Sequence, residues 1–122
     1  MKTDWVSYWK NYSLFEKLWV CRITRAYKKL LNNVKINNVK ILELGSGSGI
    51  NSLIIAKKLK ANKITLVDFN EKAIEISKEK FKNSSLNVKF LKRDILNLIL
   101  KEKFDIIHSE GLIEHFYGNE RL

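Results

Sequence analysis

A glycine-rich segment offers the clearest chemistry in this sequence. Residues 43–49 read Glu-Leu-Gly-Ser-Gly-Ser-Gly, with a glycine at every second position from Gly45. Glycine has no Cβ atom, so the backbone can turn sharply here and a ligand can approach the main chain closely. An apolar run precedes the segment and a helical pattern follows it, and the turn after a parallel strand is where open α/β folds bind ligands. The segment therefore predicts a ligand-binding turn.

The spacing of the glycines narrows the choice of ligand. Dinucleotide-binding folds use G-x-G-x-x-G, but Ile50 stands where the third glycine would be. No Lys-Ser or Lys-Thr pair follows the turn, which argues against a nucleotide-triphosphate P-loop. Glu43, two positions before the first glycine, suits a ligand that carries positive charge. A nicotinamide-binding domain is the weaker alternative.

At this point the sequence resembles the class I S-adenosylmethionine (AdoMet)-dependent methyltransferases, specifically their N-terminal half. The first motif of that family has an acidic residue two positions before G-x-G-x-G, and Glu43, Gly45, Gly47 and Gly49 match it. Later motifs are matched in order at residues 66–70, 93–95 and 104–116. The resemblance covers roughly residues 39–117. It implies that AdoMet is the cofactor.

The resemblance also implies roles for single residues. Asp68 would accept hydrogen bonds from both ribose hydroxyls, a charge-assisted bidentate arrangement. Asp94 would lie near the adenine amino group, and Ile95 would supply a backbone contact. His115 is the candidate base where an acceptor must lose a proton. The expected cofactor-binding residues are Glu43, Gly45, Ser46, Gly47, Gly49, Asp68, Phe69, Asp94, Ile95, Ser109 and Glu110, and no metal site is expected.

Each of these residues also has a plainer interpretation. Asp68 and Asp94 stand at the ends of expected strands, where aspartate often caps a turn or a helix. Glu110 and Glu114 could be acids of a first helical turn, favoured there by the helix dipole. His115 could equally be a packed or exposed helix residue, and Glu43 could be a half-exposed strand residue.

The pattern of apolar residues predicts the elements that position this turn. Two helices are expected over residues 5–12 and 14–34, with Ser13 and Glu16 as a capping box for the second. Their apolar stripe comprises Trp5, Trp9, Tyr12, Phe15, Trp19, Ile23, Ala26 and Leu30.

Beyond residue 38 the pattern alternates between strands and helices. Helices are expected over residues 50–59 and 70–81, the second with Asn70 as its N-cap. Strands are expected over residues 39–44, 64–69, 88–91 and 104–108. This alternation predicts an α/β fold with a Rossmann-like parallel sheet of about four strands and flanking helices. We expect an N-terminal helical segment, residues 1–38, that packs or forms a lid, and a partial AdoMet-binding domain, residues 39–122.

Composition and charge indicate the broad class. The 122 residues are 45% hydrophobic and 30% charged, as in soluble globular proteins. The lone Cys21, the lack of a secretory signal and the lack of a membrane-spanning run together predict a cytoplasmic protein. The net charge of +10 lies mostly in residues 1–40, which hold nine Lys/Arg and two acids. Such charge can attract nucleic acid, but a Lys-, Ile- and Asn-rich composition favours a solvated basic face.

The expected number of strands is smaller than in the complete methyltransferase fold, and this shapes the predicted function and partners. The methyltransferase fold has seven strands, and this chain has motifs for four, so residues 104–107 would form an exposed apolar edge. We expect a second polypeptide that supplies the missing strands, self-association through this edge, or a truncated product. The chain is expected to be the AdoMet-binding part of a methyltransferase. Glu114-His115 resembles the small-molecule branch of the family, so the acceptor is expected to be a small molecule. The alternative is a non-catalytic module that binds AdoMet or a partner.

Overall fold

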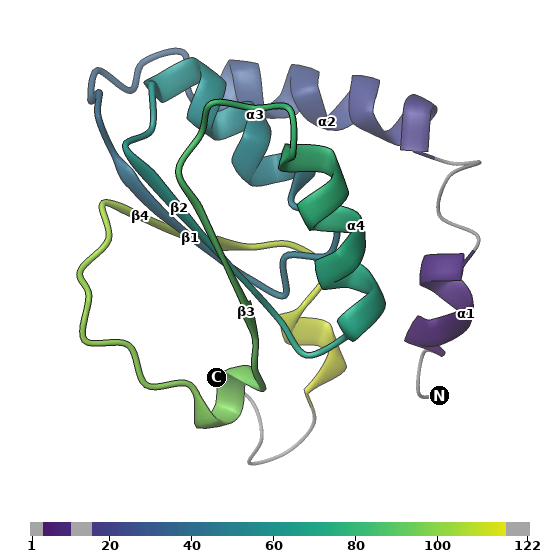
Figure 1. Ribbon diagram of the computed structural model, residues 1–122. Coiled ribbons are helices and arrows are strands. Elements are labelled where there is room, and N and C mark those ends of the chain that lie inside the picture. The colour runs from purple at the N-terminus through teal and green to yellow at the C-terminus, as the bar shows by residue number, and fades with distance from the viewer. Residues whose placement is uncertain (1–3, 11–15, 117–122) are drawn as a thin grey trace.

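The computed structural model describes residues 4–10 and 16–116, and Figure 1 shows its ribbon. It contains helices, strands and two short 3-10 turns. In chain order they are α1 (Trp5–Lys10), α2 (Glu16–Leu30), β1 (Lys40–Leu44), α3 (Ile50–Leu59), β2 (Lys63–Asp68), α4 (Glu71–Phe81), β3 (Val88–Lys92), η2 (Ile95–Asn97), β4 (Ile106–Ser109) and η3 (Ile113–His115).

The four strands form one parallel sheet in the order β3-β2-β1-β4. β1 lies at the centre, with Leu44 opposite Val67 of β2 and Ser109 of β4. Helices α3 and α4 are the crossovers between β1, β2 and β3, as a parallel sheet requires. The predicted Rossmann-like sheet is therefore confirmed, with strand ends that differ from the expected ones by one or two residues.

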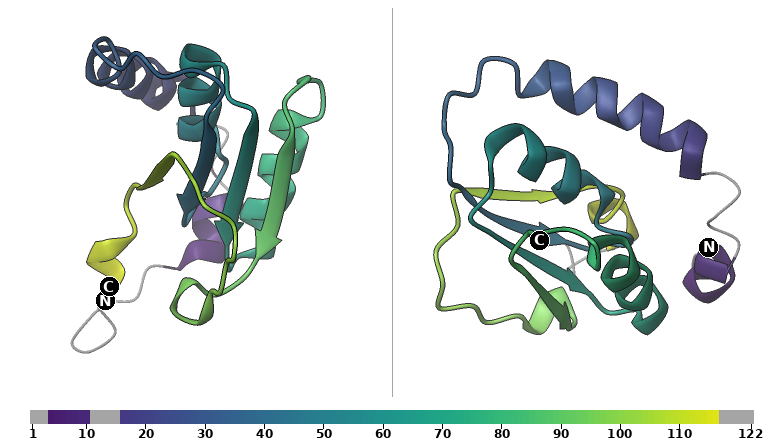
Figure 2. Two further views of the ribbon diagram at one scale, coloured as in Figure 1. Left: turned by 90° about the vertical axis from the view of Figure 1, so that its left-hand side faces the viewer. Right: turned by 45° about the horizontal axis from the view of Figure 1, so that its top comes forward.

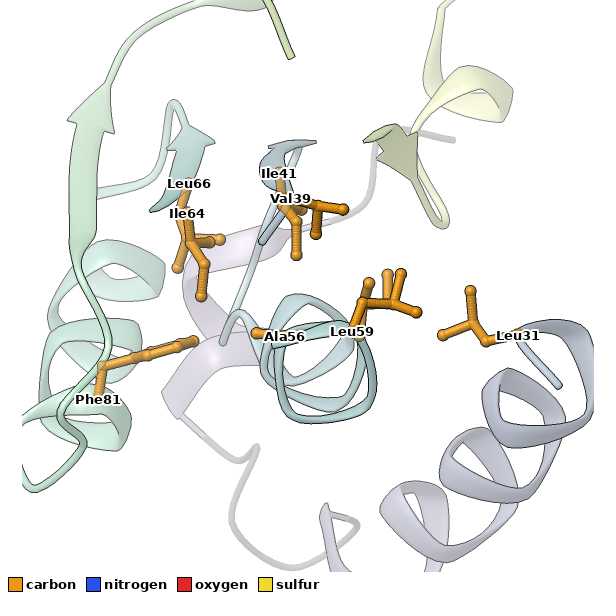
Figure 3. Close-up of a cluster of buried hydrophobic side chains, with 9 residues drawn as sticks. Leu31, Val39, Ile41, Ala56, Leu59, Ile64, Leu66 and Phe81 are labelled. Atoms are coloured by element: carbon orange, nitrogen blue, oxygen red, sulfur yellow. The ribbon is translucent and has the colours of Figure 1, made fainter. Parts of the chain in front are cut away.

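All three long helices pack on the same face of this sheet. Figure 3 shows α4, α3 and α2 side by side beneath the row of strands, with the apolar side chains pointing into the space between them. The buried cluster there comprises Leu31, Val39, Ile41, Ile55, Ala56, Leu59, Ile64, Leu66 and Phe81. Burial of this cluster fixes the orientation of β1 and β2, and thereby the positions of the turns that follow them.

The helix after β2 begins and packs as its sequence predicts. The Asn70 side chain accepts hydrogen bonds from the backbone N–H groups of Lys72 and Ala73, so Asn70 caps α4. Two of the four donors that a helix start leaves without partners are thereby satisfied. The face of α4 that carries Ala73, Ile74, Ser77 and Phe81 is buried, as expected.

The apolar stripe predicted for the second helix is partly wrong. Ile23 is buried, but Leu30 is 72% exposed and Ala26 is also exposed. From Ile23 the buried side chains instead continue in steps of four residues, to Tyr27 and then Leu31. This is the side of α2 that packs against α3. The proposed capping residue Ser13, with Tyr12 and Phe15, lies outside the described residues, as do the side chains of Trp5 and Trp19.

Strand β4 forms one edge of the described sheet. Its residue Ile107 is 62% exposed, so an apolar side chain faces solvent there. The expected apolar edge over residues 104–107 is present at Ile107 only, because Phe104 and Ile106 are half-buried and Ile106 packs against the buried cluster. No helix among the described residues is long and apolar enough to cross a membrane.

Candidate functional site

The carboxyl ends of the four strands bring the four sequence motifs to one edge of the sheet. β1 runs into the glycine turn, and its last residue pairs with Ser109 at the end of β4. The end of β3 joins the end of β2 through a hydrogen bond from Arg93 N to Asp68 O (3.0 Å). The residues at and just after the carboxyl ends of the four strands therefore lie along one edge of the sheet, which is where open parallel sheets bind ligands.

Each glycine of the turn is required by its own backbone and neighbours. Gly45, Gly47 and Gly49 have φ angles of +65°, +51° and +71°, which L-residues with a Cβ rarely adopt. A Cβ on Gly45 would lie 2.7 Å from Leu112 Cδ1, and a Cβ on Gly47 would lie 2.5 Å from Trp9 Cη2. The turn is thus covered closely, by the loop after β4 on one side and by α1 on the other.

Asp68 lies at the centre of this edge and points into the glycine turn. Its Oδ2 accepts a hydrogen bond from Gly47 N (2.8 Å) and its Oδ1 accepts one from Asn70 N (2.9 Å). The residue is only 6% exposed, and burial raises the pKa of the carboxyl while the backbone N–H groups oppose the rise. Each carboxylate oxygen has a second lone pair, so both can accept a further hydrogen bond from a ligand.

Glu43 is buried at the end of β1 rather than half-exposed. Its side chain is 1% exposed and its Oε2 accepts a hydrogen bond from Ser52 N (3.3 Å), in the first turn of α3. Burial raises the pKa of this carboxyl to about 8, with hydrogen bonds from Ser52 and Asn51 opposing the rise. The Glu43 carboxyl is therefore mostly protonated at pH 7.

His108 of β4 completes a buried polar group with Glu43. Its Nε2 shares a hydrogen bond with Ser52 Oγ (3.0 Å) and lies 3.9 Å from Glu43 Oε2. Burial lowers the pKa of the imidazole to about 4. Because burial favours the neutral form of both groups, they are a neutral pair bridged by Ser52 and not an ion pair at neutral pH.

Three further residues join this polar group: Asn51, Glu110 and Tyr27. Asn51 Nδ2 donates a hydrogen bond to Glu110 Oε2 (2.5 Å). Tyr27 of α2 packs edge-on against the His108 ring, with centroids 6.3 Å apart. Burial, together with the carboxylates of Glu110 and Glu43, raises the pKa of Tyr27 to about 12. The phenol therefore stays protonated at neutral pH.

Sequence reasoning did not identify Tyr27, Asn51, Ser52 or His108 as part of the site. Ser52 and His108 are 56 residues apart in the chain, and Asn51 and Glu110 are 59 apart. The one available signal was His108, a histidine within an otherwise apolar strand next to the expected loop.

Three further predicted cofactor-binding residues, Phe69, Asp94 and Ile95, follow the ends of β2 and β3. Phe69 is 57% exposed beside Asp68. Asp94 is exposed, and its Oδ1 accepts a hydrogen bond from Leu96 N (3.0 Å), so it caps the η2 turn that begins at Ile95. The capping role that the sequence allowed for Asp94 is thus present, and its contact with an adenine ring stays a prediction.

The loop after β4 lies over the start of the glycine turn. Leu112 approaches Gly45, and His115 N donates a hydrogen bond to Leu112 O (3.1 Å) within η3. The loop therefore carries His115 and Glu114 on the same edge of the sheet as the turn. A role for His115 as a base stays a prediction.

Buried atoms near the turn test whether this edge fits AdoMet. Ser46 Oγ and Asn51 Oδ1 are buried and have no hydrogen-bond partner among the described residues. Such atoms are rare in folded proteins unless a ligand or water satisfies them. A hydroxyl and an amide oxygen beside a carboxylate suit the polar ammonium, carboxylate and ribose groups of AdoMet. The residues present therefore fit this cofactor.

Comparison with known proteins agrees with this geometry. Residues 35–121 match a family model described as a methyltransferase domain. The ribosomal protein L11 methyltransferase of Dictyoglomus turgidum is 39% identical over 86 residues, which are 70% of this chain and 28% of that protein. The ribosomal RNA small subunit methyltransferase C of Buchnera aphidicola is 43% identical over 83 residues, 68% of this chain and 24% of that protein. This chain thus spans less than a third of either relative.

Solved structures show the same fold. A Methanococcus maripaludis protein assigned as an AdoMet-dependent methyltransferase superposes with a TM-score of 0.74 at 23% identity, covering 89% of this chain and 51% of that one. The PRMT1 enzyme-prozyme complex of Trypanosoma brucei, solved with S-adenosylhomocysteine, gives a TM-score of 0.67 at 26% identity, and the match covers 84% of this chain and 33% of that one. The sheet, the glycine turn and the match over residues 35–121 lead to one conclusion: this chain belongs to the AdoMet-dependent methyltransferase family.

Proposed function

We propose that this chain binds AdoMet at its glycine turn and forms the cofactor-binding part of a methyltransferase. The observation that carries the proposal is the Asp68 carboxylate, which is buried and held 2.8 Å from Gly47 N at the carboxyl edge of the sheet. A carboxylate fixed beside a glycine turn can bind the two hydroxyls of a ribose whose nucleoside rests on that turn.

The remaining polar atoms take complementary roles in this proposal. The Ser46 hydroxyl and the Asn51 amide oxygen bind the methionine end of the cofactor, near Glu110. Phe69 and Ile95 flank the adenine, and Asp94 accepts a hydrogen bond from its amino group. In the N-terminal segment, α1 acts as the cover, since Trp9 lies directly on Gly47, while α2 packs against α3.

In methyl transfer the main task of the protein is to align the methyl group with the acceptor. Bound AdoMet supplies an activated methyl group on a sulfonium. The chain holds the cofactor in one orientation and excludes water with Trp9 and Leu112, which is worth several kcal/mol of barrier through positioning. His115 removes a proton from the acceptor where the acceptor must lose one.

Two classes of methyl acceptor are candidates. The Glu114-His115 pair favours a small molecule by analogy with one branch of the family. The relatives favour a different class of acceptor, because they include methyltransferases named for ribosomal protein L11, ribosomal RNA and release factor glutamine. A macromolecular acceptor is therefore the second candidate, and methyl transfer from radiolabelled AdoMet to protein, RNA or small-molecule fractions separates the two.

Further strands complete the fold in this proposal by pairing with β4. The exposed Ile107 and the unpaired edge of β4 in the described sheet support this. The added strands come from a second polypeptide or from further residues of the same protein. In a non-catalytic alternative, the chain only binds AdoMet or a partner.

Calorimetric titration tests cofactor binding directly. We expect saturable heat with AdoMet, and we expect Asp68→Asn to weaken the affinity by about 10- to 100-fold, since it removes charge-assisted hydrogen bonds worth ~1.5–3 kcal/mol. Glu75→Gln on the exposed face of α4 is the matched control and should leave the affinity unchanged. Equal affinities of wild type and Asp68→Asn, or binding of NADH in place of AdoMet, would refute the proposal.

A further inference from the structure

Positive charge is concentrated in one part of the fold. Residues 17–42 and 44–67 contain eleven Lys/Arg and no Asp or Glu, while residues 68–116 contain nine of each kind. The only acids of residues 16–67 are Glu16, which pairs with Lys80, and the buried Glu43. A lysine-rich composition alone would raise the charge everywhere, so it does not explain why the acids are missing from this part only.

These cations share one surface. α2 packs along α3 (Figure 2). Arg22, Arg25 and Lys29 of α2 are exposed, and their spacing of three and four residues places them in one row on its outward face. We call the exposed cations of this layer the α2–α3 basic surface: Arg22, Arg25, Lys28, Lys29, Lys35, Lys57, Lys58 and Lys60. Within the described residues, none of the eight is in an ion pair.

The C-terminal ends of α2 and α3 lie together at the edge of the sheet where the strands begin. Leu31 and Leu59 belong to one buried cluster, and Asn38 N donates hydrogen bonds to the carbonyls of Leu59 and Lys60 (3.2 and 3.1 Å). Lys35 and Lys60, which follow Leu31 and Leu59 in the chain, therefore lie at the same end of the molecule. That end is separated from the glycine turn by the length of β1, about 16 Å for five residues.

We infer that the α2–α3 basic surface binds the phosphate backbone of a nucleic acid. Eight exposed cations, none of them in an ion pair within the described residues, form the electrostatic footprint of a polyanion site. Glu102, at the edge where the strands begin, pairs with Lys40 and Lys63 and not with these eight. Guanidinium groups on the outward row suit phosphate oxygens because their donors are planar and paired. The surface contacts backbone and not bases, so it positions a nucleic acid without selecting a sequence. This inference does not depend on methyl transfer.

An anionic membrane is the competing polyanion, and the packing of α2 disfavours it. A helix that lies on a membrane inserts its apolar face into the lipid. The apolar face of α2, with Ile23, is already buried within the fold, as is Leu31 directly after the helix. Two exposed apolar residues are close to it in sequence, Leu30 and Ile36, and each directly follows a lysine.

Fluorescence anisotropy with a labelled single-stranded RNA tests this inference. The variant Arg22→Glu/Arg25→Glu/Lys29→Glu should bind ~10-fold or more weakly than wild type and show a shallower dependence on salt, because three phosphate contacts are lost. The control Lys78→Glu/Lys89→Glu/Lys101→Glu makes the same change in net charge in the part with balanced charge. It should keep most of the affinity.

The outcomes separate the surface from general charge. Equal weakening of both variants, no RNA binding by wild type at low salt, or binding only to phosphatidylserine vesicles would overturn the inference. Binding of single-stranded DNA as tight as RNA supports it, because the backbone phosphates are shared. If charge reversal prevents folding, Arg22→Gln/Arg25→Gln/Lys29→Gln tests the same prediction.

Discussion

The carboxylate of Asp68 accepts a hydrogen bond from the backbone of Gly47 at 2.8 Å, although 21 residues separate them. This contact ties the end of β2 to the turn after β1, and it is made by a side chain that is almost fully buried. It holds the glycine turn and the ribose-binding candidate in a fixed relation before any ligand arrives. Such preorganisation lowers the cost of binding.

Gly49 should be far less tolerant of alanine than Gly111. Both have positive φ angles, but a Cβ on Gly49 would lie 2.7 Å from Leu66 Cδ1 and 2.9 Å from Phe81 Cε2, while one on Gly111 meets only Glu114 at 3.8 Å. Gly111→Ala should cost about 1 kcal/mol from backbone strain. Gly49→Ala should cost about 2 kcal/mol more, because it also overpacks the core. Urea unfolding followed by circular dichroism measures both, and equal losses would show that the contacts do not constrain the turn.

Glu43 should make the protein less stable as the pH rises above neutral. Its folded pKa of about 8 lies above the ordinary 4.5, so the unfolded chain releases this proton first and stability falls between these values. His108 has the opposite effect between about 4 and 6.5, because its pKa is lowered. Below pH 6.5 the opposite effects of Glu43 and His108 on the unfolding free energy nearly cancel. From pH 6.5 to 8 only the Glu43 effect remains, and the unfolding free energy falls by about 1.4 kcal/mol per pH unit.

Glu43→Gln separates this effect from other titrations. The variant keeps a polar group of similar size but has no proton to release, so its unfolding free energy should be flat from pH 6.5 to 8. Glu114→Gln on the exposed η3 turn is the control and should retain the wild-type slope. If Glu43→Gln retains that slope too, another group is responsible for it.

The sequence predicted the elements around β1 closely because their signals are local. The turn from Gly45 to Gly49 needs glycine for its own backbone, and Asn70 caps the helix that follows it in sequence. The sheet followed from alternating strands and helices, since parallel neighbours need a crossover between them.

Other parts of the site depend on contacts that no local pattern contains. His108 meets Ser52 only after β4 has paired with β1, and Tyr27 reaches His108 only after α2 has packed on α3. The buried face of α2 was misassigned at Leu30 for the same reason: α3 decides which side of the helix is covered, and Leu31 faces it.

The exposed edge of β4 should make this chain self-associate. In the described part of the chain β4 pairs with a strand on one side only, so its other edge, beside the exposed Ile107, offers a template for a further strand. Sedimentation velocity over a range of concentrations should detect reversible dimers or larger species, and Ile107→Lys should reduce them at least several-fold. Leu30→Lys, at an exposed apolar residue of α2, is the control and should leave association unchanged. A monomer at every concentration would argue against pairing of this 122-residue chain through the edge.

Nuclear magnetic resonance of the glycine amides tests the central claim most directly. The chain has five glycines, so selective ¹⁵N-glycine labelling gives a spectrum in which Gly45, Gly47 and Gly49 report on the turn. Titration with S-adenosylhomocysteine should shift these three resonances saturably, and the largest shift should be at Gly47, because its N–H is bonded to the carboxylate that takes the ribose. Unchanged turn resonances at millimolar ligand, or shifts confined to Gly111 and Gly118, would contradict it.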